Sequence, residues 1–350
     1  MEFLSELGLF VTKAIVVVVA IAAVAAVIAR AAARGGGGED GARGRLVVKR
    51  LNERYRRMAQ AVRAALLPRA AARAEAKAEA RRQKAERKVK GTALAEQVAR
   101  PRVFVLDFDG NLRASAVAGL REEITAVLAV ARPGDEVVLR LKSPGGLVHA
   151  YGLAASQLER VRARGLQLTA AVDLVAASGG YLMACVADRI VAAPFAVVGS
   201  IGVVAGVPNV HRLMKKHDID YELVTAGAYK RTLTVFGENT EAGRQKFQAE
   251  LDETHALFKA FVGRYRPQLD LERVATGEHW YGSQALALGL VDEVGTSDDY
   301  LLARLDRAEL VSVRHEVRRP LVERLTRGVE GALGRGVDRL LQRDFEARMP

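Results

Sequence analysis

The chain has 350 residues, half of them hydrophobic, so it can hold one or two domains with a sizeable core. Its formal net charge is +12, yet 19 Lys or Arg stand against 6 Asp or Glu between Arg30 and Lys90, which leaves the rest close to neutral. A nucleic-acid-binding domain carries basic charge on its folded part, so this distribution argues against nucleic acid as a partner. A single cysteine, Cys185, excludes an intrachain disulfide or a cysteine-based zinc site.

At the N-terminus, residues 10–29 are apolar apart from two positions, and this is about the length that crosses a ~30 Å hydrocarbon core as a helix. Glu2 and Glu6 make the preceding region acidic, which is not typical of a cleaved signal peptide. We therefore expect residues 1–34 to form an uncleaved transmembrane anchor.

Residues 35–100 begin with four glycines and continue as a basic, Ala-rich stretch. This composition is typical of an exposed helix or a disordered linker, and without an apolar stripe it is expected to stay outside the core. Its charge suits an anionic membrane surface, which makes membrane lipid an expected partner. The positive-inside rule would place this side of the anchor in the cytoplasm.

From residue 101 to 315, strand and helix patterns alternate, which predicts βα units and a mainly parallel sheet. Strands are expected at 103–106, 136–141, 166–172, 189–192 and 221–225, and helices at 120–130, 150–161 and 240–265. A second apolar stretch, 190–208, is interrupted by Pro194 and several glycines, so we expect a buried core segment there rather than a membrane span.

The tail, residues 316–350, carries widely spaced leucines among many arginines, the pattern of a basic amphipathic helix, but four glycines weaken it. Three interpretations stay open: the tail lies on a membrane, packs on a neighbouring subunit, or is frayed.

Two glycine-containing turns follow predicted strands, at residues 143–146 (SPGG) and 177–180 (ASGG). Glycine lets the backbone turn sharply and leaves N–H groups exposed, as an oxyanion hole requires. Ser178 in the second turn could present its hydroxyl to such a site. A Ser-Gly-Gly turn alone is common, however, and does not define an enzyme.

A serine nucleophile needs a base, and none of the six histidines sits in an evident catalytic arrangement. An uncharged lysine is an alternative, although lowering a lysine pKa from about 10.4 to about 7 costs roughly 4 kcal/mol, which burial can supply. Lys230 follows a predicted strand and a turn. Its position alone does not single it out among 53 basic residues.

Three segments in this order resemble the signal peptide peptidase A family: 173–181 (DLVAASGGY), 198–203 (VGSIGV) and 228–231 (AYKR). Within that family the chain is similar to the SohB type of inner-membrane peptidase, and residues 6–10 and 277–282 share that likeness. The similarity runs through most of the chain. The order and spacing of three motifs is far more specific than any one of them.

The resemblance implies a Ser/Lys dyad in which Ser178 is the nucleophile and Lys230 the general base. It also implies that Ser200 helps to orient the lysine amine. No metal, nucleotide or other cofactor is needed for this chemistry. The implied substrates are peptides or membrane-protein fragments near the bilayer.

The resemblance further implies an α/β, crotonase- or Clp-protease-like fold of repeated βα units, preceded by one transmembrane helix. The oxyanion hole would use the backbone N–H groups of Gly179 and of either Gly145 or Gly146. Family members assemble into homo-oligomeric rings, and a dyad can be completed across a subunit boundary. The expected location is the bacterial inner membrane, with the side of the catalytic domain left open.

Two other functions compete with this reading. Residues 103–112 (VFVLDFDGNL) look like the first motif of haloacid dehalogenase-type phosphatases, in which Asp107 would attack phosphate and Asp109 would act as acid and base with Mg²⁺. The later acidic pair that such an enzyme needs is not evident. The other alternative is a catalytically inactive, ring-forming membrane scaffold.

Overall fold

The computed structural model describes residues 44–68, 71, 74, 77, 78, 81, 100–227 and 229–317. The predicted anchor at 1–34 and almost all of the tail at 316–350 lie outside these residues. No helix in the described part of the chain is both long and apolar enough to span a bilayer. Nearly all described residues belong to one compact unit, Leu46–His315.

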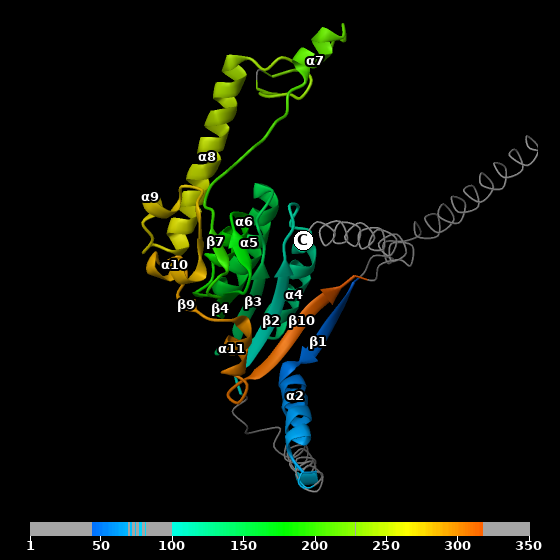
Figure 1. The fold of residues 1–350 in the computed structure, drawn as a ribbon, viewed down its shortest axis with the longest axis vertical. Helices are drawn as coiled ribbons and strands as arrows, with labels where there is room; N and C mark the ends of the chain where they lie inside the picture. Colours follow the sequence, from blue (N-terminus) through cyan, green and yellow to red (C-terminus); the bar gives the residue numbers. More distant parts are fainter. Residues whose placement is uncertain are drawn as a thin grey trace, which may run out of the picture. The chain divides into compact units, whose positions relative to one another are not determined.

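A seven-stranded sheet forms the frame of this unit, in the order β1-β10-β2-β3-β4-β6-β9 (Figure 1). The strands are β1 (Arg45–Arg50), β2 (Arg102–Asp109), β3 (Glu136–Lys142), β4 (Gln167–Val172), β6 (Arg189–Ala192), β9 (Glu293–Val294) and β10 (Glu309–Glu316). From β10 to β9 every neighbouring pair is parallel, which confirms the predicted mainly parallel sheet.

A smaller sheet of three strands carries the region around the two predicted serines, in the order β5 (Val175–Ala177), β7 (Val197–Gly199), β8 (His279–Tyr281). β5 and β7 are parallel, and β8 is antiparallel to β7. An isolated bridge between Ser143 and Ala176 joins this sheet to the end of β3. The two glycine turns are thereby held on neighbouring strands.

The helices are α2 (Leu51–Leu66), α4 (Val117–Val130), α5 (Val148–Ala163), α6 (Gly179–Ala184), α7 (His211–Lys216), α8 (Glu241–Tyr265), α9 (Leu271–Val274), α10 (Gly282–Ala287) and α11 (Ser297–Leu302). Successive side chains of a strand point to opposite faces, so β2 contributes side chains to two hydrophobic cores, one on each face of the sheet. Phe104, Leu106 and Phe108 pack with α4, α5 and α6. Val103 and Val105 pack on the other face with α11 and the start of α2. Burial on both faces explains why these strands read as continuous apolar runs.

The predicted strands at 103–106, 136–141, 166–172 and 189–192 and all three predicted helices are confirmed. The strand predicted at 221–225 is wrong, because these residues have no regular secondary structure and are exposed. No strand in the described part of the chain pairs with them.

The segment predicted as a linker, 35–100, differs from expectation near its middle. Within it, β1 lies beside β10 in the sheet, and Leu51 is buried with Tyr55 packed beside it. The Asn52 side-chain amide donates to the carbonyls of Leu305 and Ala308. The core therefore begins well before residue 101, because Leu51 and Tyr55 pack into it and the Asn52 amide holds the start of α2 by hydrogen bonds.

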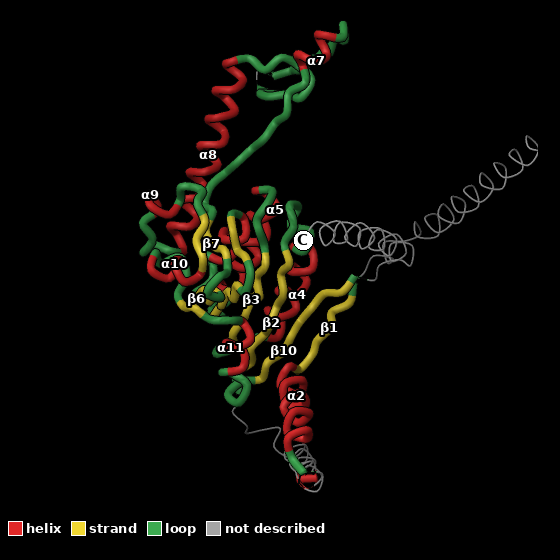
Figure 2. The backbone as a smooth tube through the Cα atoms, viewed as in Figure 1, coloured by secondary structure: helices red, strands yellow, loops and turns green. Residues whose placement is uncertain are grey.

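After β7 the chain leaves the sheet as an arm, residues 202–240, and returns as α8. None of the arm's described residues is buried. Figure 2 shows the arm mostly as loop, with α7 near the N-terminal end of α8, while the other end of α8 lies near α9 and α10. The apolar stretch predicted as core, 190–208, is thus buried only in part: Phe195 is 83% exposed, the last buried residue is Ile201, and Val204 is 94% exposed.

A buried ion pair supports α8 against the sheet and carries a stability prediction. Arg266 is 3% exposed, and its guanidinium donates to both carboxylate oxygens of Asp292 at 2.8 and 2.7 Å. Arg266→Met is expected to destabilise the fold by about 3 kcal/mol at pH 7, because it leaves a partly buried carboxylate without its partner.

This loss should shrink in acid. Burial would raise the pKa of Asp292, but hydrogen bonds from Arg266 and the Ile190 N–H outweigh burial and lower it. The pair's contribution is therefore present above the unfolded-state pKa of about 3.9 and is lost as pH falls through the lowered value. Urea unfolding of wild type and variant at pH 7 and pH 3 measures the difference. Equal losses at both pH values would assign the effect to packing instead of charge.

Candidate active site

Ser178 occupies the sharp turn between β5 and α6, as predicted. Its backbone has φ 51° and ψ −119°, a region that residues with a side chain rarely adopt. Such a conformation costs of order 1–3 kcal/mol and is found mostly at functional sites. The Ser178 N–H donates to the Gly199 carbonyl at 2.8 Å, and its own carbonyl accepts from the Leu182 N–H. Hydrogen bonds on both sides thus hold the serine in this strained turn.

Ser200 lies beside this turn, at the end of the neighbouring parallel strand. In the β5–β7 register Ala177 is opposite Gly199, so the two serines that follow occupy equivalent positions, with strands about 4.8 Å apart. Ser200 also has φ 51°, and its N–H donates to the Glu278 carbonyl at 2.7 Å. The structure therefore brings together two residues that are far apart in the motif pattern.

The first glycine turn lies directly against Ser178. Gly145 has φ +92°, and a Cβ there would stand 2.8 Å from both the Ser178 Cβ and the Gly179 nitrogen. The Gly145 N–H donates to the Ser143 hydroxyl oxygen at 3.1 Å. In contrast, the N–H groups of Gly146 and Gly179 meet no acceptor among the described residues. The turns thus offer two free donors: Gly179, which directly follows Ser178, and Gly146, in the turn that lies against it.

Lys230, in contrast, lies on the arm and is exposed. The ring of its neighbour Tyr229 lies 5.5 Å from the Lys246 amine, near the start of α8. The segment that carries Ser200 contacts α8 closer to the C-terminal end of the helix, where a His255 ring nitrogen and the Ile201 carbonyl are 3.2 Å apart. Between Lys246 and His255 the helix rises roughly 13 Å. Within one chain, the lysine segment is therefore well separated from the two serines.

The two carboxylates of the phosphatase-like motif are held in ion pairs at the end of β2. Asp107 accepts hydrogen bonds from Arg140 at 2.7 Å and Arg314 at 3.0 Å. Asp109 is largely exposed and pairs with Lys142. Among the residues that the structure describes, no group of three or more His, Cys, Asp or Glu could hold a metal ion.

Cys185 is fully buried, and its thiol donates to the Leu182 carbonyl. Burial strongly raises the pKa of this thiol, so it stays protonated and is no nucleophile. Cys185 is therefore a small core residue.

Sequence reasoning missed Ser143 and Tyr151, which are both fully buried behind the first glycine turn. Their hydroxyl oxygens are 2.5 Å apart. The available signal was the serine that directly follows β3 as the first residue of the turn.

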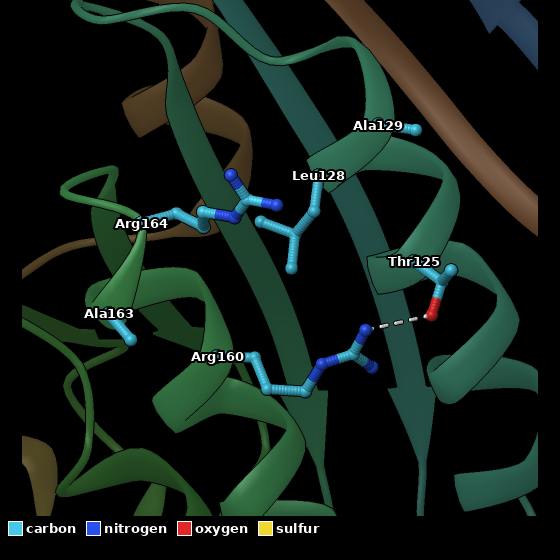
Figure 3. Close-up of a pocket in the computed structure, with 6 residues that line it drawn as sticks. All are labelled: Thr125, Leu128, Ala129, Arg160, Ala163 and Arg164. Atoms are coloured by element: carbon cyan, nitrogen blue, oxygen red, sulfur yellow. Dashed lines mark hydrogen bonds between the residues drawn. The ribbon is translucent and has the colours of Figure 1, made fainter.

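A surface groove of about 490 Å³ lies between α4 and α5 (Figure 3). It is lined by Thr125, Leu128, Ala129, Arg160, Ala163 and Arg164. Arg160 donates to the Thr125 hydroxyl at 3.1 Å. The groove sits at the C-terminal end of α5, whereas the glycine turn precedes its N-terminal end, roughly 20 Å away along a helix of this length. The groove is therefore separate from the candidate active site.

A strained serine between a strand and a helix, facing free backbone N–H groups at the ends of parallel strands, is typical of α/β hydrolytic enzymes. Comparison with known proteins narrows this class. The family model described as peptidase family S49 N-terminal matches residues 2–158, and the one described as peptidase family S49 matches residues 160–311.

The chain is 58% identical to Probable protease SohB of Haemophilus influenzae over 70% of its own length and 69% of the relative's. It is 56% identical to the protein of the same name from Buchnera aphidicola of Acyrthosiphon pisum, over 66% of this chain and 68% of the relative. The chain therefore belongs to peptidase family S49, as a protease of the SohB type, which confirms the resemblance found in the motifs.

Among solved structures, one similar chain is a mutant of the 1510-N membrane-bound stomatin-specific protease in complex with a substrate peptide. The two are 13% identical, with a TM-score of 0.41, over 66% of this chain and 99% of the other.

Proposed function

We propose that this protease is a membrane-anchored serine endopeptidase that cleaves peptides or membrane-protein fragments with a dyad of Ser178 and Lys230. The observation that carries the proposal is the strained Ser178 turn beside the free N–H groups of Gly179 and Gly146. Membership of a peptidase family supports peptide hydrolysis over the phosphatase alternative, since Asp107 is already held by two arginines.

In the proposed reaction, the uncharged Lys230 amine takes the proton of the Ser178 hydroxyl as its oxygen attacks a peptide carbonyl. The developing oxyanion accepts hydrogen bonds from Gly179 and Gly146, and the lysine returns its proton to the leaving amine. Water then hydrolyses the acyl-enzyme by the same route in reverse. Ser200, one strand away, would orient the lysine amine.

Lys230 would come from a neighbouring copy of the chain in a homo-oligomeric ring. Lysine acts as a base only when uncharged, which burial favours, and Lys230 is exposed in a single chain. The arm also exposes a set of large apolar side chains that a partner surface would cover. They are Val204, Val207, Leu213, Ile219, Tyr221, Leu223, Val224, Tyr229 and Phe236.

The apolar stretch at 10–29 and the basic residues after it support a single-pass anchor in the bacterial inner membrane, with contacts to anionic lipid. This would hold the protease close to membrane-protein substrates. The amphipathic tail at 316–350 is a further candidate for a membrane or subunit contact.

Ser178→Ala is expected to abolish cleavage of a fluorogenic peptide while leaving the thermal unfolding temperature near that of wild type. A serine-directed fluorophosphonate probe should label the wild type and leave this variant unlabelled. If the wild type neither cleaves peptides nor takes the label, the inactive-scaffold alternative is favoured.

Lys230→Met is expected to be as inactive as Ser178→Ala, because the base is lost. Lys230→Arg should fail as well, since arginine keeps its charge and cannot accept the serine proton. Peptide cleavage by Lys230→Arg at a rate near that of wild type would contradict an uncharged-lysine base.

A further inference from the structure

The residues behind the first glycine turn form a chain of hydrogen bonds that starts at the turn itself. The Gly145 N–H donates to the Ser143 Oγ at 3.1 Å, and this hydroxyl is 2.5 Å from the Tyr151 hydroxyl. The Tyr151 hydroxyl donates to the Asn111 carbonyl at 2.9 Å. Because each hydroxyl carries one proton, the direction is fixed: Ser143 must donate to Tyr151.

This chain is buried and fully satisfied. Ser143 and Tyr151 are both 0% exposed. Burial raises the pKa of Tyr151, so its hydroxyl keeps the proton that it donates to Asn111. A buried polar network with every member paired is rigid, since each alternative arrangement leaves an unpaired group.

A second set of contacts, with residues 110–112, fixes the turn on its other side. The Leu147 N–H donates to the Leu112 carbonyl at 2.8 Å, and a Cβ on Gly146 would collide with that carbonyl oxygen. A Cβ on Gly110 would collide with the hydroxyls of Ser143 and Tyr151. Residues 110–112 (Gly-Asn-Leu) are the end of the phosphatase-like motif, so these three residues have a structural role that involves no phosphate.

The Tyr151 ring also touches the second turn. A Cβ on Gly179 would collide with this ring, which packs edge-on against Phe108 with centroids 6.3 Å apart. Tyr151 therefore contacts the backbone of one proposed oxyanion donor, Gly179, and through Ser143 it holds the turn that carries the other.

We infer that Tyr151 and Ser143 are positioning residues: the Ser143 hydroxyl, held by Tyr151, accepts from the Gly145 N–H, so that the Gly146 N–H is the donor that faces the oxyanion. The inference rests on the proposed serine mechanism and deepens it. Neither side chain touches substrate. Their role is to hold two backbone N–H groups at the spacing that a tetrahedral intermediate needs, where a displacement of about 1 Å costs on the order of 100-fold in rate.

The test uses full-length Tyr151→Phe, which keeps the ring and removes only the hydroxyl. We expect kcat to fall about 10- to 100-fold with KM within about twofold, because only the transition state uses the oxyanion hole. The inhibition constant of a peptide aldehyde, which forms a tetrahedral adduct, should rise by the same factor as kcat/KM falls.

Ser143→Ala should give a similar loss, and the double variant should lose little more than either single variant, because both act through one network. Tyr300→Phe is the matched control. Its hydroxyl is also buried and contacts Glu136 and Thr169 on the other face of the sheet, so it should lower thermal stability and leave kcat unchanged.

Unchanged kcat and unchanged aldehyde inhibition in Tyr151→Phe, with Ser178→Ala inactive, would overturn the positioning role and leave the proposed function standing. Equal losses of kcat in Tyr151→Phe and Tyr300→Phe would also overturn it, since they would indicate a general loss of stability. Peptide cleavage by Ser178→Ala would overturn the proposed function, and this inference with it.

Discussion

Co-expression of two inactive variants, Ser178→Ala and Lys230→Met, is expected to restore peptide cleavage. If each site takes its serine from one copy and its lysine from the next, some contacts in a mixed ring pair an intact serine with an intact lysine. For random assembly about one quarter of the contacts would do so. The reason is the placement of Lys230 on an exposed arm: its neighbour Tyr229 contacts α8 at Lys246, roughly 13 Å along the helix from His255, which contacts Ile201.

The measurement is the specific activity of complexes that carry two different affinity tags and are purified on both. The control pairs Ser178→Ala with the double variant Ser178→Ala/Lys230→Met, which should stay inactive because no intact serine is present. Inactive mixed complexes of native size would mean that the arm folds back in each chain and completes the dyad there.

Gly145→Ala is expected to lower kcat by about 100- to 1,000-fold, the loss typical of a damaged oxyanion hole. The added Cβ would stand 2.8 Å from the Ser178 Cβ, the Gly179 nitrogen and the Ala177 carbonyl oxygen, all within the site. The positive φ of +92° adds about 1–2 kcal/mol of backbone strain for a residue with a side chain. The Gly145 turn and the Ser178 turn would therefore have to move apart.

Gly134→Ala is the control that separates the effect of backbone strain from the effect of a steric collision. Gly134 has nearly the same φ, +90°, but a Cβ there would meet nothing within 4 Å. It lies in the loop between α4 and β3, at the opposite ends of the strands from Ser178. This variant should lose a similar amount of stability through strain and keep its kcat. Equal kinetic losses in both variants would contradict a specific role for the Gly145 turn.

The sequence was sufficient to predict the local features of the site and most strands of the sheet. Strands β2, β3, β4 and β6 could be predicted from their apolar runs, because both faces of these strands are buried. The turn at Ser178 could be predicted because glycines follow a strand pattern and precede a helix pattern. The strand predicted at 221–225 is wrong because its apolar residues are exposed and pair with no strand among the residues that the structure describes.

The sequence by itself determined the parallel α/β architecture, the two glycine turns and the place of Ser178 within the second turn, since each depends on residues that are neighbours in the chain. Only the tertiary structure decided that Ser178 and Ser200 stand side by side, that the Gly145 N–H is occupied while the Gly146 N–H is free, and that Leu51 belongs to the core. It also decided that Lys230 lies on the arm, away from the serines. These outcomes depend on strand register and on contacts between distant segments, which no local pattern encodes.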